Sequence, residues 1–234
     1  MVNEQLEQPT RDVLRRRQAR FIGHSDDVWT HLRNWIVQDG EIPELHIGAT
    51  LQDHALRASC WTIRTSPGPE GVTELPGPDP SGDGAPHYEL TGTVEWRQES
   101  SSVVLRVGGF HVLAQPITVQ QVPGTSREDS VVERFSPDFF VPPLGTTVTV
   151  GCRLEVMADY ETEDTVGAPD RLRCGWVVRH LKIQHRALSR APGSEGEWSV
   201  GRVVRVDTIE RMHRWTDEQG RDPITYLLDL QLPT

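Results

Sequence analysis

The sequence predicts a mainly β (α+β) protein, built as an antiparallel barrel or two-layer sandwich of about seven or more strands. One or two N-terminal helices are expected to pack on this β unit. Three observations support this class: a long alternating stretch at residues 146–160, a meander-like pattern at residues 88–115, and further alternating stretches after residue 173. The order of these elements is also compatible with an oligonucleotide-binding-type barrel, a likeness of fold that carries no function.

The stretch at residues 146–160 is predicted to be the central strand. Successive side chains of a strand point to opposite faces, so we expect one buried face and one wetter face, the latter with Arg153 and Glu155. The apolar residues that define the buried face occupy every second position: Val148, Val150, Cys152, Leu154, Val156 and Ala158.

The chain has 234 residues, which is long enough to bury a sizeable core. Residues 1–9 are polar and are predicted to be a disordered tail. Residues 10–64 are expected to supply the N-terminal helices and first strands, packed on the β unit. Residues 65–87 form a Pro- and Gly-rich loop, and residues 88–234 form one antiparallel β domain.

Residues 10–20 are predicted to form a short, strongly basic helix that Thr10 can cap. One interpretation is a solvated helix lying on the acidic body of its own chain, and the other is a docking arm for an acidic partner. The arginines that would dock are Arg11, Arg15, Arg16, Arg17 and Arg20.

A second helix is predicted from Ser25, a suitable N-cap, to Gly40, a natural stop. Two aspartates follow Ser25 in the first turn, where the helix dipole favours negative charge. The apolar residues at helical spacing are Val28, Trp29, Leu32, Trp35 and Ile36. We expect this helix to cross the sheet or to close one end of a barrel.

Gly108-Gly109 is predicted to be the turn of a hairpin. A two-residue turn would place Val107 opposite Phe110, Leu105 opposite Val112 and Val103 opposite Ala114, so that all six lie on one face. The alternative is a bulge that bends one continuous strand at the glycines.

Two more β segments are expected near the C-terminus. A return strand begins at Arg173, with Leu181 and Ile183 on one face and a polar row on the other. A last hairpin then joins an arm at residues 199–210 to an arm at residues 223–232.

The formal net charge of −10 opposes nonspecific binding to nucleic acid. No stretch is long and apolar enough to span a membrane, and the N-terminus lacks the pattern of a signal peptide, so we expect a cytoplasmic protein. Cys60, Cys152 and Cys174 have no paired spacing, which predicts neither a disulfide framework nor a zinc site.

No recognised catalytic or cofactor motif is present in the sequence, and no two histidines have the spacing of a helical zinc pair. We therefore expect no metal and no cofactor. A site assembled from distant strands would leave no such signature.

One dense basic cluster lies on the predicted return strand. Cross-strand pairing on the sheet surface explains such a cluster as well as a binding face does. The candidate binding residues are Trp176, Arg179, His180, Lys182, His185 and Arg186.

These observations favour a noncatalytic protein-binding or scaffold (adaptor) protein whose partner is another protein or a second copy of the chain. One alternative is a small-molecule-binding protein or enzyme with its site in the barrel mouth. The other is a single-stranded nucleic-acid binder, which the net charge disfavours.

Overall fold

A computed structural model of the chain describes most of the sequence. None of its helices in the described part is long enough to serve as a membrane span. The described residues are 20–22, 27–75, 86–98, 102–121, 131–135, 142–163, 170–190, 198–213 and 224–232.

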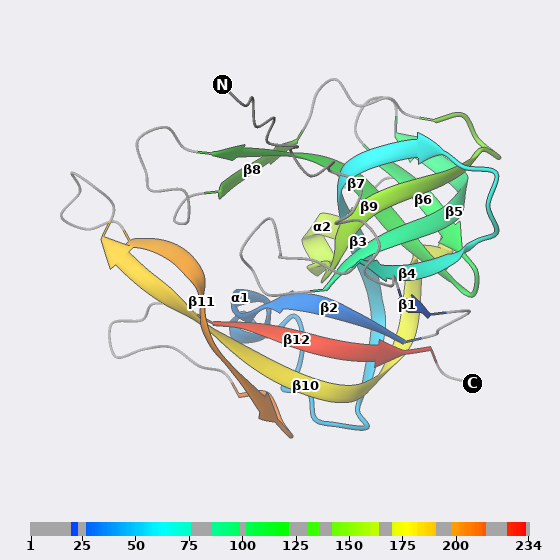
Figure 1. Ribbon diagram of the computed structural model, residues 1–234. Helices are drawn as coiled ribbons and strands as arrows, with labels where there is room; N and C mark the ends of the chain where they lie inside the picture. Colours follow the sequence, from blue (N-terminus) through cyan, green and yellow to red (C-terminus); the bar gives the residue numbers. More distant parts are fainter. Residues whose placement is uncertain are drawn as a thin grey trace, which may run out of the picture.

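Strands dominate the described residues and form one twelve-stranded sheet (Figure 1). The strands are β1 (Arg20–Ile22), β2 (Asp27–Arg33), β3 (Thr50–Thr65), β4 (Gly71–Leu75), β5 (His87–Gln98), β6 (Ser102–Val107), β7 (Phe110–Gln121), β8 (Val131–Phe135), β9 (Thr147–Val156), β10 (Arg173–Arg190), β11 (Trp198–Ile209) and β12 (Ile224–Gln231). The helices are α1 (Asn34–Gln38), α2 (Asp159–Glu163) and a 3-10 turn at Asp170–Leu172. The predicted β class is confirmed.

The pairings close two rings of strands that share β3 and β9. In the first ring β3 pairs with β7, β7 with β6, β6 with β5, β5 with β9, and β9 with β3. In the second ring β3 pairs with β10, β10 with β12, β12 with β2, and β2 with β9. Figure 1 shows the first ring above and the strands of the second ring below. The long strands β3 and β9 therefore run from one ring into the other.

The sheet is mixed, although the sequence predicted antiparallel pairing. β3 runs parallel to β7, and β2 runs parallel to β9 through the single pair His31 and Glu155. Both parallel pairs join segments far apart in the chain, for which the local pattern holds no signal. β4 lies inside the segment that was predicted to be a loop, and it pairs with β5.

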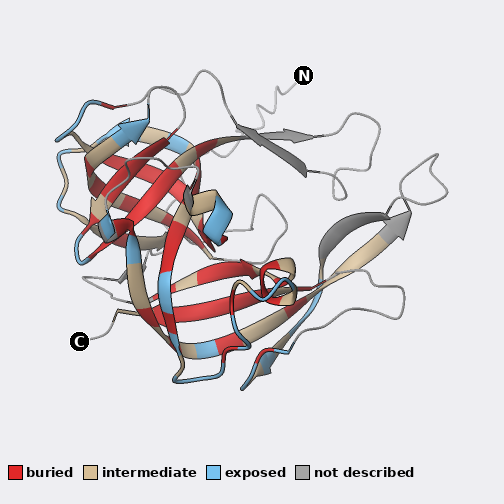
Figure 2. Cartoon of the chain, turned by 180° about the vertical axis from the view of Figure 1, so that it is seen from behind, coloured by how far each residue is buried: buried red, intermediate tan, exposed pale blue. Residues whose placement is uncertain are grey.

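One apolar core runs through both rings (Figure 2). It includes Val103 and Val112 from the first ring and Val28 and Leu228 from the second. Between the rings the Phe110 ring meets the Trp176 ring edge-on, with centroids 5.4 Å apart. Burial of this shared core stabilises the two rings as one unit, because apolar surface from both is removed from water together.

The predicted wetter face of the central strand is wrong. Thr149 and Glu155 on that face are each only 5% exposed, whereas Leu154 on the core face is 1% exposed. β9 is covered on both faces because it forms part of both rings. The sequence showed the alternation of β9, but it did not show that other elements also bury its second face.

The predicted helix from Ser25 to Gly40 is also wrong over Asp27–Arg33, which is β2, while Ser25 and Asp26 lie outside the described residues. Val28, Thr30 and Leu32 are buried on one face, while Trp29 and Arg33 are partly exposed on the other. β12 pairs with this strand from Asp27 to Arg33 and β9 adds the single pair His31 with Glu155, and such tertiary pairing outweighs helical spacing. Helix begins only at Asn34, and Gly40 follows it with a φ of 81°.

The predicted glycine hairpin is confirmed. Val107 pairs with Phe110, Leu105 with Val112 and Val103 with Ala114. Gly108 takes a φ of 58°, which glycine adopts without strain. The alternative of one continuous bulged strand is excluded, since β6 and β7 lie antiparallel.

The predicted last hairpin is wrong. β11 pairs with one edge of β10 and β12 pairs with the other, so β10 separates the two arms. The return strand itself begins at Arg173 as predicted. Pairing of β10 on both edges lets β12 join β2 and complete the second ring.

Candidate functional site

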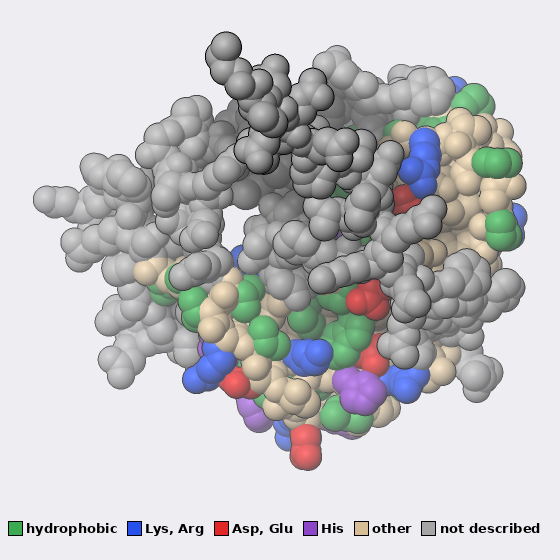
Figure 3. Space-filling view, viewed as in Figure 1, with side chains coloured by type: hydrophobic (Ala, Val, Ile, Leu, Met, Phe, Trp, Pro, Cys, Tyr) green, Lys and Arg blue, Asp and Glu red, His purple; other side chains and the backbone are tan. Residues whose placement is uncertain are grey.

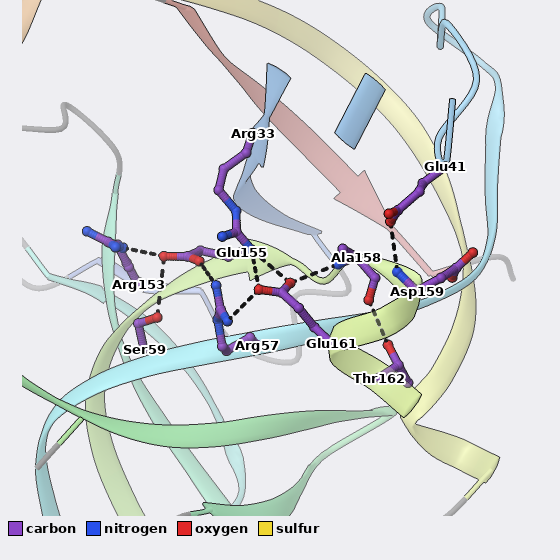
Figure 4. A network of polar contacts seen from close by, with 10 residues as sticks. All are labelled: Arg33, Glu41, Arg57, Ser59, Arg153, Glu155, Ala158, Asp159, Glu161 and Thr162. Carbon is purple, nitrogen blue, oxygen red and sulfur yellow. Dashed lines mark hydrogen bonds and ion pairs between the residues drawn. The ribbon is translucent and has the colours of Figure 1, made fainter. Parts of the chain in front are cut away.

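A network of ion pairs lies where the two rings meet, on the side of β3 and β9 away from the core (Figure 4). Glu155 accepts hydrogen bonds from Arg57 and from Nε of Arg153, the latter at 2.7 Å. Glu161 of α2 accepts from Arg57 Nη1 at 3.1 Å and from Arg33 Nη2 at 2.7 Å. Four elements, β2, β3, β9 and α2, are therefore joined by charged groups.

Local structure at the start of α2 holds Glu161 in place. Its Oε2 accepts a hydrogen bond from the backbone N–H of Ala158 at 2.9 Å. A glutamate that reaches back to the residue before a helix is half of a capping box. Asp159 N–H donates to Glu41 at 3.0 Å, which ties the same turn to the chain that follows α1.

The electrostatics keep both carboxyl groups ionised. Burial opposes ionisation of Glu155, but the charges of Arg57 and Arg153 outweigh burial and hold its pKa well below the ordinary value. The pKa of Glu161 is lowered as well, because Arg57 and Arg33 outweigh burial there. Carboxylates with lowered pKa values have no proton to donate near neutral pH, so this network is suited to joining elements rather than to general acid catalysis.

A second group of polar residues lies on the outer face of the second ring. The outer face is the side of β10, β12 and β2 that carries His180, Asp229 and Trp29, which are partners across the three strands. The next row on this face contains Lys182, Leu227 and His31. This row continues into the ion network, because His31 pairs with Glu155 and Glu155 pairs with Arg57. Figure 3 shows hydrophobic, basic, acidic and histidine side chains interleaved over this part of the molecule.

The Trp29 ring is the centre of a compact arrangement that we call the Trp29 cluster: Trp29, His180, Lys182 and Asp229. The Lys182 ammonium lies 4.3 Å from the Trp29 ring centroid, within cation–π range. The His180 ring stacks on Trp29 with centroids 6.4 Å apart, and its Nδ1 pairs with Asp229 Oδ2 at 2.7 Å. Lys182 is the single lysine of the chain.

The structure brings together two of the candidate binding residues of β10. His180 is exposed and Lys182 is partly exposed, and both lie on the outer face. His185 has the opposite parity and bonds Asp207 at 3.1 Å. Arg186 lies past a shift in the pairing with β11, and Arg179 lies at a shift in the pairing with β12. The basic cluster is therefore divided between both faces of β10.

The remaining candidates are placed elsewhere. Trp176 is buried in the core against Phe110 and lies apart from the Trp29 cluster. Arg20 is in β1, whose backbone pairs with β4 at the edge of the sheet. Arg11, Arg15, Arg16 and Arg17 lie outside the described residues, as does the rest of the predicted basic helix.

Sequence reasoning missed Trp29 and Asp229 as members of this group. Trp29 was assigned to the apolar stripe of a helix, and Asp229 fell within the second arm of the predicted last hairpin, at residues 223–232. The detectable signal was a lone carboxylate in the otherwise apolar run LLDL, since a charge in a half-buried strand usually has a partner.

Comparison of the chain with family models, with curated proteins and with solved structures finds no match.

Proposed function

We propose that the protein is a noncatalytic protein-binding or adaptor protein whose partner protein contacts the Trp29 cluster. The supporting observation is that Lys182 and His180, two residues expected to bind from sequence, converge on one tryptophan ring. Tryptophan is among the residues that contribute most to binding at protein interfaces. The cluster also offers donors on Lys182 to a carbonyl or carboxylate oxygen of a partner.

Single-stranded nucleic acid is the runner-up ligand, because bases also stack on aromatic rings beside cations. Two features favour a protein. Lys182 and His180 already occupy positions against the Trp29 ring, so a base would have to displace one of them. Asp229, on the same face, repels phosphate.

The test uses Lys182→Glu beside a matched control, Arg64→Glu. Arg64 is an exposed cation far from the Trp29 cluster in the sheet: it lies on β3 and bonds Glu89 at 2.8 Å. The native chain and the control should recover the same stoichiometric partner from cell extract, and the purified partner should bind Lys182→Glu at least about tenfold more weakly. Because Lys182 is the one lysine, a bound partner should also protect it from acetylation.

Equal binding of the purified partner to Lys182→Glu and to the native chain would contradict the proposal. So would tight, strongly salt-dependent binding of a single-stranded oligonucleotide that Lys182→Glu abolishes, which would favour the nucleic-acid alternative. Reproducible turnover of a small molecule would favour the enzyme alternative.

A further inference from the structure

β11 is an edge strand in the part of the sheet that the structure describes. It ends the strand order, and its described pairing is with β10 alone. Figures 1 and 2 both show the second half of β11 at the margin of the molecule. An edge strand presents backbone N–H and C=O groups that can pair with another strand.

Exposed apolar side chains gather along this edge. Val204 is 60% exposed and Val206 is 47% exposed, although both are β-branched residues in a strand. Ile47 is 43% exposed, and its N–H donates to the carbonyl of Glu210 just past the end of β11. Three of the five exposed large hydrophobic residues of the described chain therefore lie on or beside β11.

The charge pattern of β11 is complementary to itself in one antiparallel register. With a two-fold axis through Val206, Arg205 of one copy lies opposite Asp207 of the other, and Val204 lies opposite Thr208. An axis through Arg205 or through Asp207 would place like charges opposite each other, which is unfavourable. The side chains of Arg205 and Asp207 are 64% and 42% exposed, so both are accessible to a second copy.

We infer that β11 binds β11 of a second copy of this chain as an antiparallel, two-fold symmetric edge pair centred on Val206. Main-chain hydrogen bonds would join the strands, and an isologous contact closes at two copies. Within one chain Arg205 Nε bonds Asp207 at 2.8 Å. In the dimer, Arg205 of each copy would also lie opposite Asp207 of the other copy. This inference does not depend on the Trp29 cluster or on the proposed function.

The first test is a charge swap followed by sedimentation over a range of protein concentrations. Arg205→Asp and Asp207→Arg each place like charges opposite each other and should weaken self-association at least about tenfold. The double variant restores opposite charges in the same register, so it should return to within about threefold of the native chain. Thermal melting of each variant checks that it is folded.

The second test is a cross-link that does not depend on the charges. Partners in an antiparallel ladder have Cα atoms about 4.5–5.5 Å apart, which suits a disulfide. Val206→Cys should therefore form a covalent dimer on mild oxidation much faster than Val204→Cys, which faces Thr208. Equal cross-linking at both positions, or a native chain that stays monomeric at about millimolar concentration, would overturn the inference. The inference would also be overturned if the double charge variant did not recover self-association.

Discussion

Arg57 of β3 and Glu155 of β9 are direct partners in the antiparallel ladder, and their side chains form an ion pair. This pair lies on the side of the ladder away from the core, where the two rings meet. Burial opposes the charge on Arg57, but Glu155 and Glu161 outweigh it and raise the pKa of the guanidinium. Both partners are therefore held in their charged forms.

Glu155→Gln should destabilise the fold by about 3–5 kcal/mol, because it leaves buried Arg57 and Arg153 without their carboxylate. Chemical denaturation at pH 7 measures this loss. The matched control is Glu89→Gln, which removes the exposed pair with Arg64 and should cost about 0–1 kcal/mol. Equal losses in the two variants would contradict the role of the buried network.

The contribution of Glu155 should also depend on pH. Its folded-state pKa lies below the ordinary value of 4.5, so its stabilisation is present above that value and is lost as the pH falls through the folded-state pKa. The stability difference between the native chain and Glu155→Gln should therefore be full at pH 7 and shrink in acid. A difference that grows as the pH falls would have the wrong sign.

The central strand should lose stability from substitutions on both faces. Leu154→Ala is expected to cost about 2–5 kcal/mol, since Leu154 is 1% exposed in the core. Arg153→Ala should cost about 1.5–3 kcal/mol by removing a hydrogen bond to the buried Glu155 carboxylate, more than an exposed position would predict. Arg64→Ala is the control at an exposed position. If Arg153→Ala lost as little stability as Arg64→Ala, the burial of this face of β9 would be contradicted.

Gly108→Ala should destabilise the β6–β7 hairpin by about 1–2 kcal/mol, because Gly108 has a φ of 58°. The cost should come from the backbone alone, since a Cβ at this position would meet no atom within 4 Å. Gly71→Ala is the matched control, because Gly71 has the same open space around it but does not have a positive φ. Thermal melting that shows equal stability for both variants would exclude a special role for the turn.

Cys60 and Cys152 should form a disulfide when the protein is oxidised. They are ladder partners of β3 and β9, and both are buried. Diamide accepts the two thiol hydrogens as the S–S bond forms, so the product should be lighter by two hydrogen atoms. Burial raises the pKa of the Cys152 thiol, so the reaction should be slow without mild denaturant. Mass spectrometry with Cys60→Ala as control checks this, and a bond to Cys174 would contradict it.

Local patterns were sufficient for several elements of the fold. The alternation at residues 146–160 predicted β9, and Gly108-Gly109 predicted a hairpin with the observed register. Such features depend on neighbours within a few residues, so one sequence contains the information for them. The polar row of β10 from His180 to Lys182 also followed from parity alone.

Only part of the Trp29 cluster could be predicted from the sequence. Parity placed His180 and Lys182 on one face, but their contacts with Trp29 depend on β12 lying between β10 and β2. Trp29 itself belongs to a segment whose helical spacing was overridden by pairing on both edges.

The sequence by itself determined the β class, the strand phases and the tight turn, because these depend on side-chain periodicity and backbone preference close along the chain. Only the tertiary structure decided that β9 is buried on both faces, that β11 and β12 flank β10, and that Arg57 meets Glu155. These outcomes depend on which distant strands share hydrogen bonds and exclude water together. That choice is made by the whole core at once, and no local window of the sequence contains it.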